Sequence, residues 1–286
     1  MITSEQYVLN VVQNPKLIEI AYRAIQGGNV EEEEIVAKTG LESDGDGNGT
    51  FEQATDGLLT FGLARKSEYK YHPESLAFEI DDWELNFRMT MLHNITKEAT
   101  EPDWGKQSAV VLNYEWLLDN KQYFSGTSSE LRNKIDRWHQ EQGYEPRNNN
   151  GERMKLNPEK FNHWRNQAEY LGLIHPTKGR SSTYTVAPDP DLVSASVYAA
   201  CEEDGDGEGI ETQKYVDWLN QNLLRVPLTT EGEFTKPFAS TLYRLAKNER
   251  IALVKHGDQA QVGLNGVAID SNDGIAKNAN YITVNT

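Results

Sequence analysis

The sequence predicts a mainly α-helical protein with small β-hairpins, built from three similar modules. One order of signals occurs three times: two segments of helical periodicity, a third segment rich in leucine, and then a hairpin. In the first two modules the third helix stops at Gly62 or Gly172, and glycine readily takes the left-handed conformation at a helix end. After each stop, apolar residues alternate around a polar turn, which is typical of paired strands.

Composition sets outer limits on the class of protein. The chain has 286 residues, 37% of them hydrophobic, which indicates a globular protein of two or three domains. No apolar run approaches the roughly 18 residues of a membrane-spanning helix, and the start MITSEQYVLN lacks the pattern of a secretory signal. Cys201 is the single cysteine, so an intrachain disulfide or a cysteine-rich zinc site is excluded. We expect a cytoplasmic protein without membrane contact.

The first module is assigned to residues 1–105. A stripe of apolar residues with helical spacing begins at Leu17, and Gly27 and Gly28 end that helix. The later helices of this module are expected at residues 30–38 and 51–61. A partly helical connector is expected at residues 76–99.

The second and third modules are assigned to residues 106–188 and 189–286. In the second, Thr127 or Ser128 is a good N-cap for a helix, and Asn157 followed by Pro158 is a good start for the next. The segment 143–156 between these helices is interpreted as an inserted turn. The helices of both modules are expected at residues 110–123, 130–142, 158–171, 191–203, 211–223 and 236–248.

The net charge of −16 is unevenly distributed. Residues 1–105 carry 8 basic and 20 acidic side chains, and residues 189–286 carry 8 and 15. Residues 106–188 carry 12 basic and 9 acidic side chains, a net charge of +3. The acidic total therefore does not exclude a nucleic-acid partner for the middle module, because net charge bears on solubility and steering rather than on fold.

Three helices followed by a hairpin of this length resemble the winged-helix variant of the helix-turn-helix. The likeness rests on element order and on the glycine-leucine stop before the hairpin, and the third module, with Asn248-Glu249-Arg250 at the stop, fits less closely. The resemblance implies tandem three-helix bundles with wings, in three copies. It also implies a role of the kind that such modules have in prokaryotic transcription regulation, replication or DNA-targeting defence.

The third helix of the middle module is the best candidate for contact with double-stranded DNA. Phe161, Trp164, Ala168 and Leu171 have the spacing of a core face. The opposite face is then expected to carry side chains that commonly contact phosphates and base edges. These are Lys160, Asn162, His163, Arg165, Asn166 and Gln167. A solvated polar face is the alternative interpretation.

The predicted wing and inserted turn add cations to this candidate DNA site. Lys178 and Arg180 lie in the wing, and Arg147, Arg153 and Lys155 lie in or near the inserted turn. In a winged helix the third helix enters the major groove, so these cations would contact the DNA backbone. The third module also has cations near its third helix and hairpin, which predicts a possible second DNA contact. These are Lys236, Arg244, Lys247, Arg250 and Lys255.

The acidic first module suits a different kind of partner. Glu31 to Glu34 begin its second helix, where acidic side chains favour the helix dipole but would repel phosphate. Residues 1–105 are therefore expected to bind a protein, or nothing. The alternative function is a protein-interaction adaptor or scaffold subunit of a larger complex, and an accessory to a metal-dependent nuclease is a third.

The sequence predicts no enzyme, metal or cofactor. Two loops, Asp44–Gly49 and Asp204–Gly209, alternate carboxylates with glycine as calcium loops do. Position twelve should then be acidic, but it is Thr55 or Tyr215, so solvated acidic turns are the better interpretation. The histidines have no metal-binding spacing, and Cys201 lies in an apolar helix pattern typical of core.

Overall fold

The computed structural model describes residues 7–28, 30–44, 49–101, 104–148, 150–257, 260–270 and 273–285. It is a mixed α/β structure, 47% helical and 15% strand, with small sheets that are mostly antiparallel. The expectation of a mainly α protein is therefore only partly correct. None of the helices in these ranges combines the length and apolar character needed to cross a bilayer.

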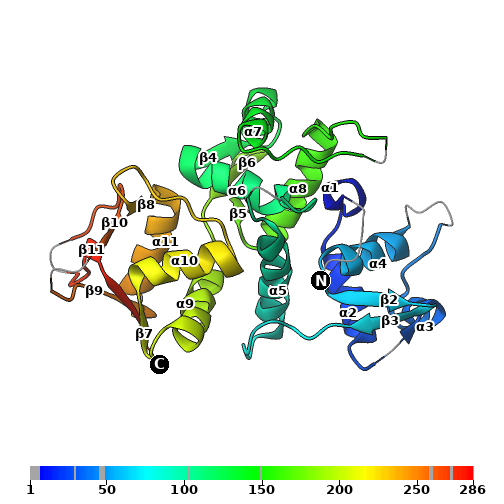
Figure 1. Ribbon diagram of the computed structural model, residues 1–286, viewed down its shortest axis with the longest axis horizontal. Coiled ribbons are helices and arrows are strands. Elements are labelled where there is room, and N and C mark those ends of the chain that lie inside the picture. The colour runs from blue at the N-terminus through cyan, green and yellow to red at the C-terminus, as the bar shows by residue number, and fades with distance from the viewer. Residues whose placement is uncertain are drawn as a thin grey trace. The chain divides into compact units, whose positions relative to one another are not determined.

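One order of elements recurs three times along the chain: helix, strand, helix, helix, strand, strand (Figure 1). The first set is α2 (Lys16–Ile25), β1 (Val30–Glu31), α3 (Glu32–Thr39), α4 (Thr50–Thr60), β2 (Ala64–Ser67) and β3 (Lys70–Pro73). The second is α6 (Ala109–Asn120), β4 (Tyr123–Ser125), α7 (Ser129–Glu141), α8 (Pro158–Tyr170), β5 (Ile174–Pro176) and β6 (Thr183–Val186). The third is α9 (Pro190–Asp204), β7 (Gly209–Glu211), α10 (Thr212–Asn222), α11 (Lys236–Lys247), β9 (Ile251–Val254) and β12 (Tyr281–Val284).

The three sets also share one strand arrangement. The sheets have the orders β1-β3-β2, β4-β6-β5 and β7-β12-β9, so the last strand of each set pairs with both others. Sequence periodicity predicted the hairpin in the first two sets but missed the first strand of all three. These first strands are only two or three residues long, which is too short to show an alternation of apolar and polar residues. In the third set the expected hairpin within residues 242–264 is wrong, because β9 pairs with the distant β12 and the segment at residues 262–264 belongs to another sheet.

Several elements lie outside the repeated order. They are α1 (Val8–Val11), α5 (Trp83–Glu98), β8 (Glu233–Phe234), β10 (Val262–Leu264) and β11 (Asn278–Ala279). The last three form a further sheet in which β10 pairs parallel with β8 and antiparallel with β11. Helix α5 accounts for most of the expected connector at residues 76–99, whereas α1 was not expected.

The predicted helix ends are mostly confirmed. Ser128 is the N-cap of α7, and its hydroxyl accepts a hydrogen bond from the backbone N–H of Leu131 at 3.2 Å. Gly62 and Gly172, which follow α4 and α8, have φ angles of 62° and 76°. After α11 the left-handed residue is Glu249, with φ of 56°, so a side chain occupies a conformation that glycine adopts more easily.

The chain divides into two compact units. The first comprises residues 1–110 and 126–171, and the second comprises residues 111–125 and 172–286. The predicted middle module, 106–188, contributes to both: α7 and α8 belong to the first unit, and strands β4, β5 and β6 belong to the second.

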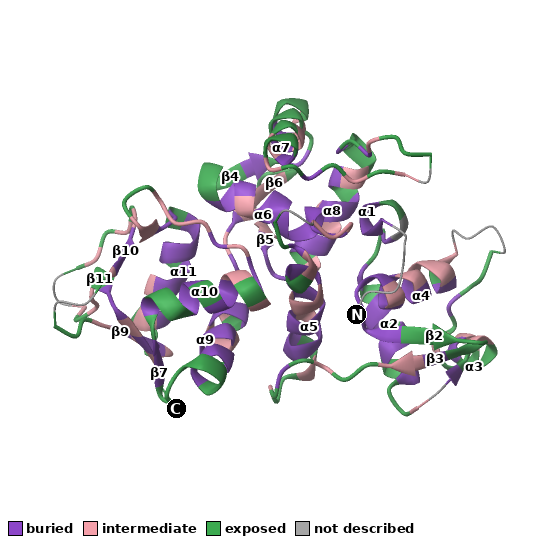
Figure 2. Ribbon diagram, viewed as in Figure 1, coloured by how far each residue is buried: buried purple, intermediate pink, exposed green. Residues whose placement is uncertain are grey.

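In the first unit, α2 packs against α4 and also contacts β3. Gly57 of α4 permits this approach, since a Cβ there would lie 2.5 Å from Cγ1 of Ile18. The rings of Tyr22, Trp83 and Phe87 join α2 to α5, with centroids 5.2–6.1 Å apart. Figure 2 shows the buried stretch of α2 beside the mostly exposed strand β2.

In the second unit, α9 contacts both α10 and α11. Tyr215 and Trp218 of α10 are buried, and the Tyr215 and Ser196 hydroxyls lie 2.7 Å apart. Cys201 is fully buried in α9, as its apolar pattern predicted. Burial also raises the pKa of this thiol to about 11, which is unfavourable for a nucleophile at neutral pH.

Candidate nucleic-acid interface

The core face of α8 is as expected. Asn157 is the N-cap, and its side-chain oxygen accepts a hydrogen bond from the Lys160 N–H at 2.8 Å, with Pro158 in the first turn. Phe161 and Trp164 are fully buried, with stacked rings 5.4 Å apart. The Trp164 indole donates to the Val110 carbonyl at 3.0 Å, which fixes the rotation of α8 within the first unit.

The expectation that the whole polar face of α8 is exposed is wrong for three residues. His163 is only 5% exposed, and its Nδ1 lies 2.9 Å from the Leu9 carbonyl oxygen. Gln167 is fully buried and donates to the Val12 carbonyl at 3.1 Å. Asn166 is half-buried and donates to the Gln13 carbonyl at 3.0 Å.

The physical reason is that the short helix α1 lies on this face of α8. A helix end leaves backbone carbonyls without intrahelical partners. Asn166 and Gln167 follow His163 by three and four residues, so the three side chains lie on one face of α8. There they hydrogen-bond to backbone carbonyls in and just after α1. Val8, Leu9 and Val12 are fully buried. The side chains of His163, Asn166 and Gln167 are therefore engaged by backbone carbonyls, and periodicity within α8 could not reveal it.

The three other candidate residues of α8 are exposed or half-buried, and their side-chain hydrogen bonds given below go to residues outside α1. Asn162 is exposed, and the Arg165 guanidinium, on a half-buried side chain, donates to the Asn162 side-chain oxygen. Lys160 is half-buried, and its ammonium donates to the Lys155 carbonyl at 3.3 Å. Burial lowers the pKa of Lys160 from its ordinary value.

The three cations of the inserted turn before α8 differ in how far they are buried and in their partners. Arg153 is largely buried and pairs with Asp136 of α7 at 2.9 Å, so it holds the turn on α7 rather than facing a ligand. Arg147 is exposed, but it donates to the Gly151 carbonyl at 2.8 Å and lies 3.3 Å from Glu145. Lys155 is exposed.

The predicted wing is the turn between β5 and β6 in the second unit. Gly179 and Ser182 have φ angles of 78° and 53°, which close this turn. Lys178 and Arg180 are exposed, and no carboxylate among the described residues pairs with either. The wing therefore presents two uncompensated positive charges.

The corresponding hairpin of the first repeat, β2–β3, contrasts with this wing. Its three cations are each within ion-pair distance of a glutamate. The pairs are Arg65–Glu74 at 3.4 Å, Lys66–Glu32 at 2.5 Å and Lys70–Glu31 at 3.3 Å. The two hairpins thus share topology but not charge.

The predicted DNA-contact residues fall into two sets. Lys155, Lys160, Asn162 and Arg165 lie at the start and exposed side of α8 in the first unit. Lys178 and Arg180 lie in the wing, in the second unit. Of the cations predicted in the third module, Arg250 pairs with Asp191 at 2.6 Å and Lys247 with Asp273 at 3.6 Å.

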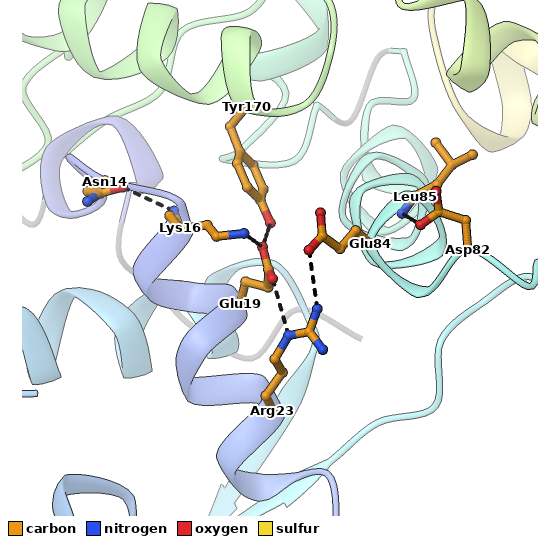
Figure 3. A network of polar contacts seen from close by, with 8 residues as sticks. All are labelled: Asn14, Lys16, Glu19, Arg23, Asp82, Glu84, Leu85 and Tyr170. Atoms are coloured by element: carbon orange, nitrogen blue, oxygen red, sulfur yellow. Dashed lines mark hydrogen bonds and ion pairs between the residues drawn. The ribbon is translucent and has the colours of Figure 1, made fainter. Parts of the chain in front are cut away.

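Sequence analysis missed a buried carboxylate in the first unit, Glu19 of α2 (Figure 3). Lys16 and Arg23 reach it at 2.6 and 3.2 Å, and the Tyr170 hydroxyl of α8 donates to it at 2.9 Å. Burial raises the pKa of this carboxyl, but the hydrogen bonds from Lys16 and Tyr170 outweigh that effect, and the pKa lies below its ordinary value. Because its partners satisfy it, Glu19 ties α2 to α8 and is not available as a general base.

The acidic loop 204–209 does not present its carboxylates as a calcium site would. Asp206 accepts hydrogen bonds from the N–H groups of Glu208 and Gly209 at 3.1 and 2.8 Å, and from the Tyr281 hydroxyl at 2.5 Å. Its oxygens therefore close the loop onto β12.

Residues 45–48 of the other acidic loop, and residues 102–103 of the first predicted boundary, lie outside the described ranges. Within those ranges no group of three histidine, cysteine or acidic side chains could hold a metal ion.

Comparisons of this chain with protein-family models, curated proteins and solved structures give no match.

Proposed function

We propose that the chain is a non-enzymatic double-stranded DNA-binding protein whose three repeats are winged-helix modules. The common order of helix, strand, helix, helix, strand, strand supports the module assignment, as does the central position of the last strand in each sheet. Such a protein would act in transcription regulation, replication or DNA-targeting defence.

The observation that carries the DNA proposal is the charge of the wing in the second repeat. Lys178 and Arg180 are exposed and uncompensated among the described residues, whereas the cations of the equivalent β2–β3 hairpin are paired with glutamates. Uncompensated cations on a projecting hairpin suit a DNA backbone, because neutralising phosphates releases condensed counterions. Asn162 and Arg165 are the accessible candidates for base contact, and Lys155 and Lys160 for phosphate contact.

A salt titration of duplex binding tests this proposal. The test variant carries Lys178→Gln with Arg180→Gln, and the control carries Arg65→Gln with Lys70→Gln, the same charge change on the equivalent hairpin. We expect the slope of log affinity against log salt to become flatter by roughly 0.9 for each DNA phosphate that is no longer neutralised, thus by about two in the test variant only. The control should keep the wild-type slope.

Two outcomes would contradict the proposal. If the wild-type protein shows no salt-sensitive binding to any duplex, DNA is not its partner. If both variants flatten the slope equally, binding follows net charge and not the wing.

A protein-interaction adaptor is the second candidate, and Tyr69 favours it. This side chain is 79% exposed at the tip of the β2–β3 hairpin, in the segment whose cations are already neutralised. An exposed aromatic ring without surrounding positive charge suits a protein surface better than a phosphate backbone. A stoichiometric partner that binds the wild-type chain but not Tyr69→Ser, with no duplex binding, would favour the adaptor.

A further inference from the structure

A cavity of about 200 Å³ lies in the second unit, where the end of α6 and the start of α11 approach each other. Residues 118–122 line one side, and residues around Thr229 and residues 235–237 line the other, together with Asn265. The DNA contacts proposed above at the wing and at α8 do not use this cavity, although Lys236, one of the cations predicted for a second DNA contact, lines it.

The charge of the cavity lining is positive. Lys121 and Lys236 are among the lining residues, and no described carboxylate pairs with either. Asp119 is the only acidic side chain in the lining, and it accepts a hydrogen bond from the Asn120 amide at 3.2 Å. Two cations against one partnered carboxylate favour an anionic ligand.

The start of α11 adds donors to the same place. Thr235 is the N-cap, but its side chain makes no capping hydrogen bond, so the first turn lacks its usual acceptor. Thr235 is only 4% exposed, it lines the cavity, and its hydroxyl has no hydrogen-bond partner among the residues that the structure describes. A buried hydroxyl without a partner costs free energy, and an anion would satisfy both the hydroxyl and the helix end.

We propose that this cavity binds a phosphate group, held by Lys121, Lys236 and Thr235 at the N-terminus of α11. The polar side chains of Gln122, Thr229 and Asn265 complete a lining suited to phosphate oxygens. Two sources share this chemistry: inorganic phosphate and a backbone phosphate of nucleic acid. Only the second source rests on the proposed DNA-binding function.

Thermal unfolding of the full chain in millimolar inorganic phosphate, against chloride of equal ionic strength, tests the cavity. Phosphate also stabilises proteins in general by exclusion from their surface, so the readout is the difference between variants. We expect a saturable rise in Tm for the wild type, and a roughly tenfold or greater loss of apparent phosphate affinity for Lys121→Gln and Lys236→Gln. Lys277→Gln, at an exposed lysine of the same unit outside the cavity, is the matched control and should respond as the wild type does.

Thr235→Val is a further test variant, which keeps the test decisive if the lysine variants fold poorly. It removes a hydroxyl without a partner and keeps the shape, so Tm without phosphate should stay constant or rise while the phosphate response weakens. An absent saturable response in the wild type, or equal responses in all four variants and the wild type, would overturn the proposal.

Duplex binding by the same variants distinguishes the two sources. A salt slope flatter by about one in Lys236→Gln, with Lys277→Gln unchanged, identifies the ligand as a nucleic-acid phosphate. An unchanged slope, together with a weakened response to inorganic phosphate, identifies free phosphate. If no duplex binds at all, the proposed function fails but the phosphate titration still decides the cavity.

Discussion

At the scale of single residues, burial sets the chemistry of several polar groups. His139 of α7 is only 4% exposed, and its ring lies edge-on to Tyr144 at 5.1 Å. Within the described part of the chain its Nε2 has no hydrogen-bond partner. Burial lowers the pKa of His139 to about 4, while the nearby Asp136 and Arg153 act in opposite directions. The neutral imidazole is therefore part of the folded state.

This histidine predicts a pH dependence of stability. The ordinary pKa of 6.5 applies to the unfolded chain, so protons bind the unfolded state more readily. The stability contributed by His139 is present above pH 6.5 and is lost as the pH falls from there toward 4. We expect a loss of about 2 kcal/mol between about pH 7 and about pH 5 from this residue.

Denaturant unfolding of the wild type and of His139→Gln at both pH values measures this effect. The variant should lose that part of the pH dependence, whatever its absolute stability. His175→Gln, which removes a less buried histidine, is the control. An unchanged pH dependence in His139→Gln would show that other groups produce the acid sensitivity.

At the scale of elements, the contact between α1 and α8 gives the polar residues of α8 two different environments. Those that face α1 stabilise the fold, and those on the other side are exposed or half-buried. Gln167→Ala removes the bond to the buried Val12 carbonyl and should lower the free energy of unfolding by about 1–3 kcal/mol. Asn162→Ala changes an exposed side chain and should alter stability by less than about 0.5 kcal/mol. Duplex affinity should show the reverse pattern, measured where both variants are folded.

These two substitutions decide which side of α8 faces a ligand. If Gln167→Ala keeps wild-type stability but loses duplex affinity, then α1 does not hold this face in solution. The face would then be free to contact base edges, as the periodicity of α8 alone indicated.

At the scale of the whole molecule, both compact units take residues from the segment 106–188, and its assignment as a module of its own stays a prediction. The segment 106–188 holds α8, but the groups that bury α8 include Leu9 and Val12, in and just after α1 and outside that segment. An isolated fragment 106–188 would leave His163 and Gln167 without partners and would expose apolar surface. We expect this fragment to lack a cooperative thermal transition and a native near-ultraviolet circular dichroism signal.

The full chain provides the reference for that measurement. A fragment 106–188 that melts cooperatively with the signal of the full chain would contradict the division into two compact units. It would also support the prediction that the middle segment is a module of its own.

Several features follow from the sequence because they depend on neighbours along the chain. Asn157 caps α8, Gly62 and Gly172 take left-handed conformations, and Lys178 and Arg180 occupy an exposed turn. Capping, glycine conformation and polar turns are local properties, readable within a few residues. The charge contrast between the acidic first segment and the middle segment is likewise present in the composition.

Only the tertiary structure determines which partners the other polar residues have. His163 meets a carbonyl 154 positions away, and Gln167 one 155 positions away. Arg153 meets Asp136 of the preceding helix, and Glu19 of α2 meets Tyr170 of α8. Amide, imidazole and guanidinium groups bind backbone, carboxylate and nucleic acid by the same hydrogen bonds, so their residue types predict the chemistry but not the partner. Which partner is present depends on the distant segment that the fold places against each helix face.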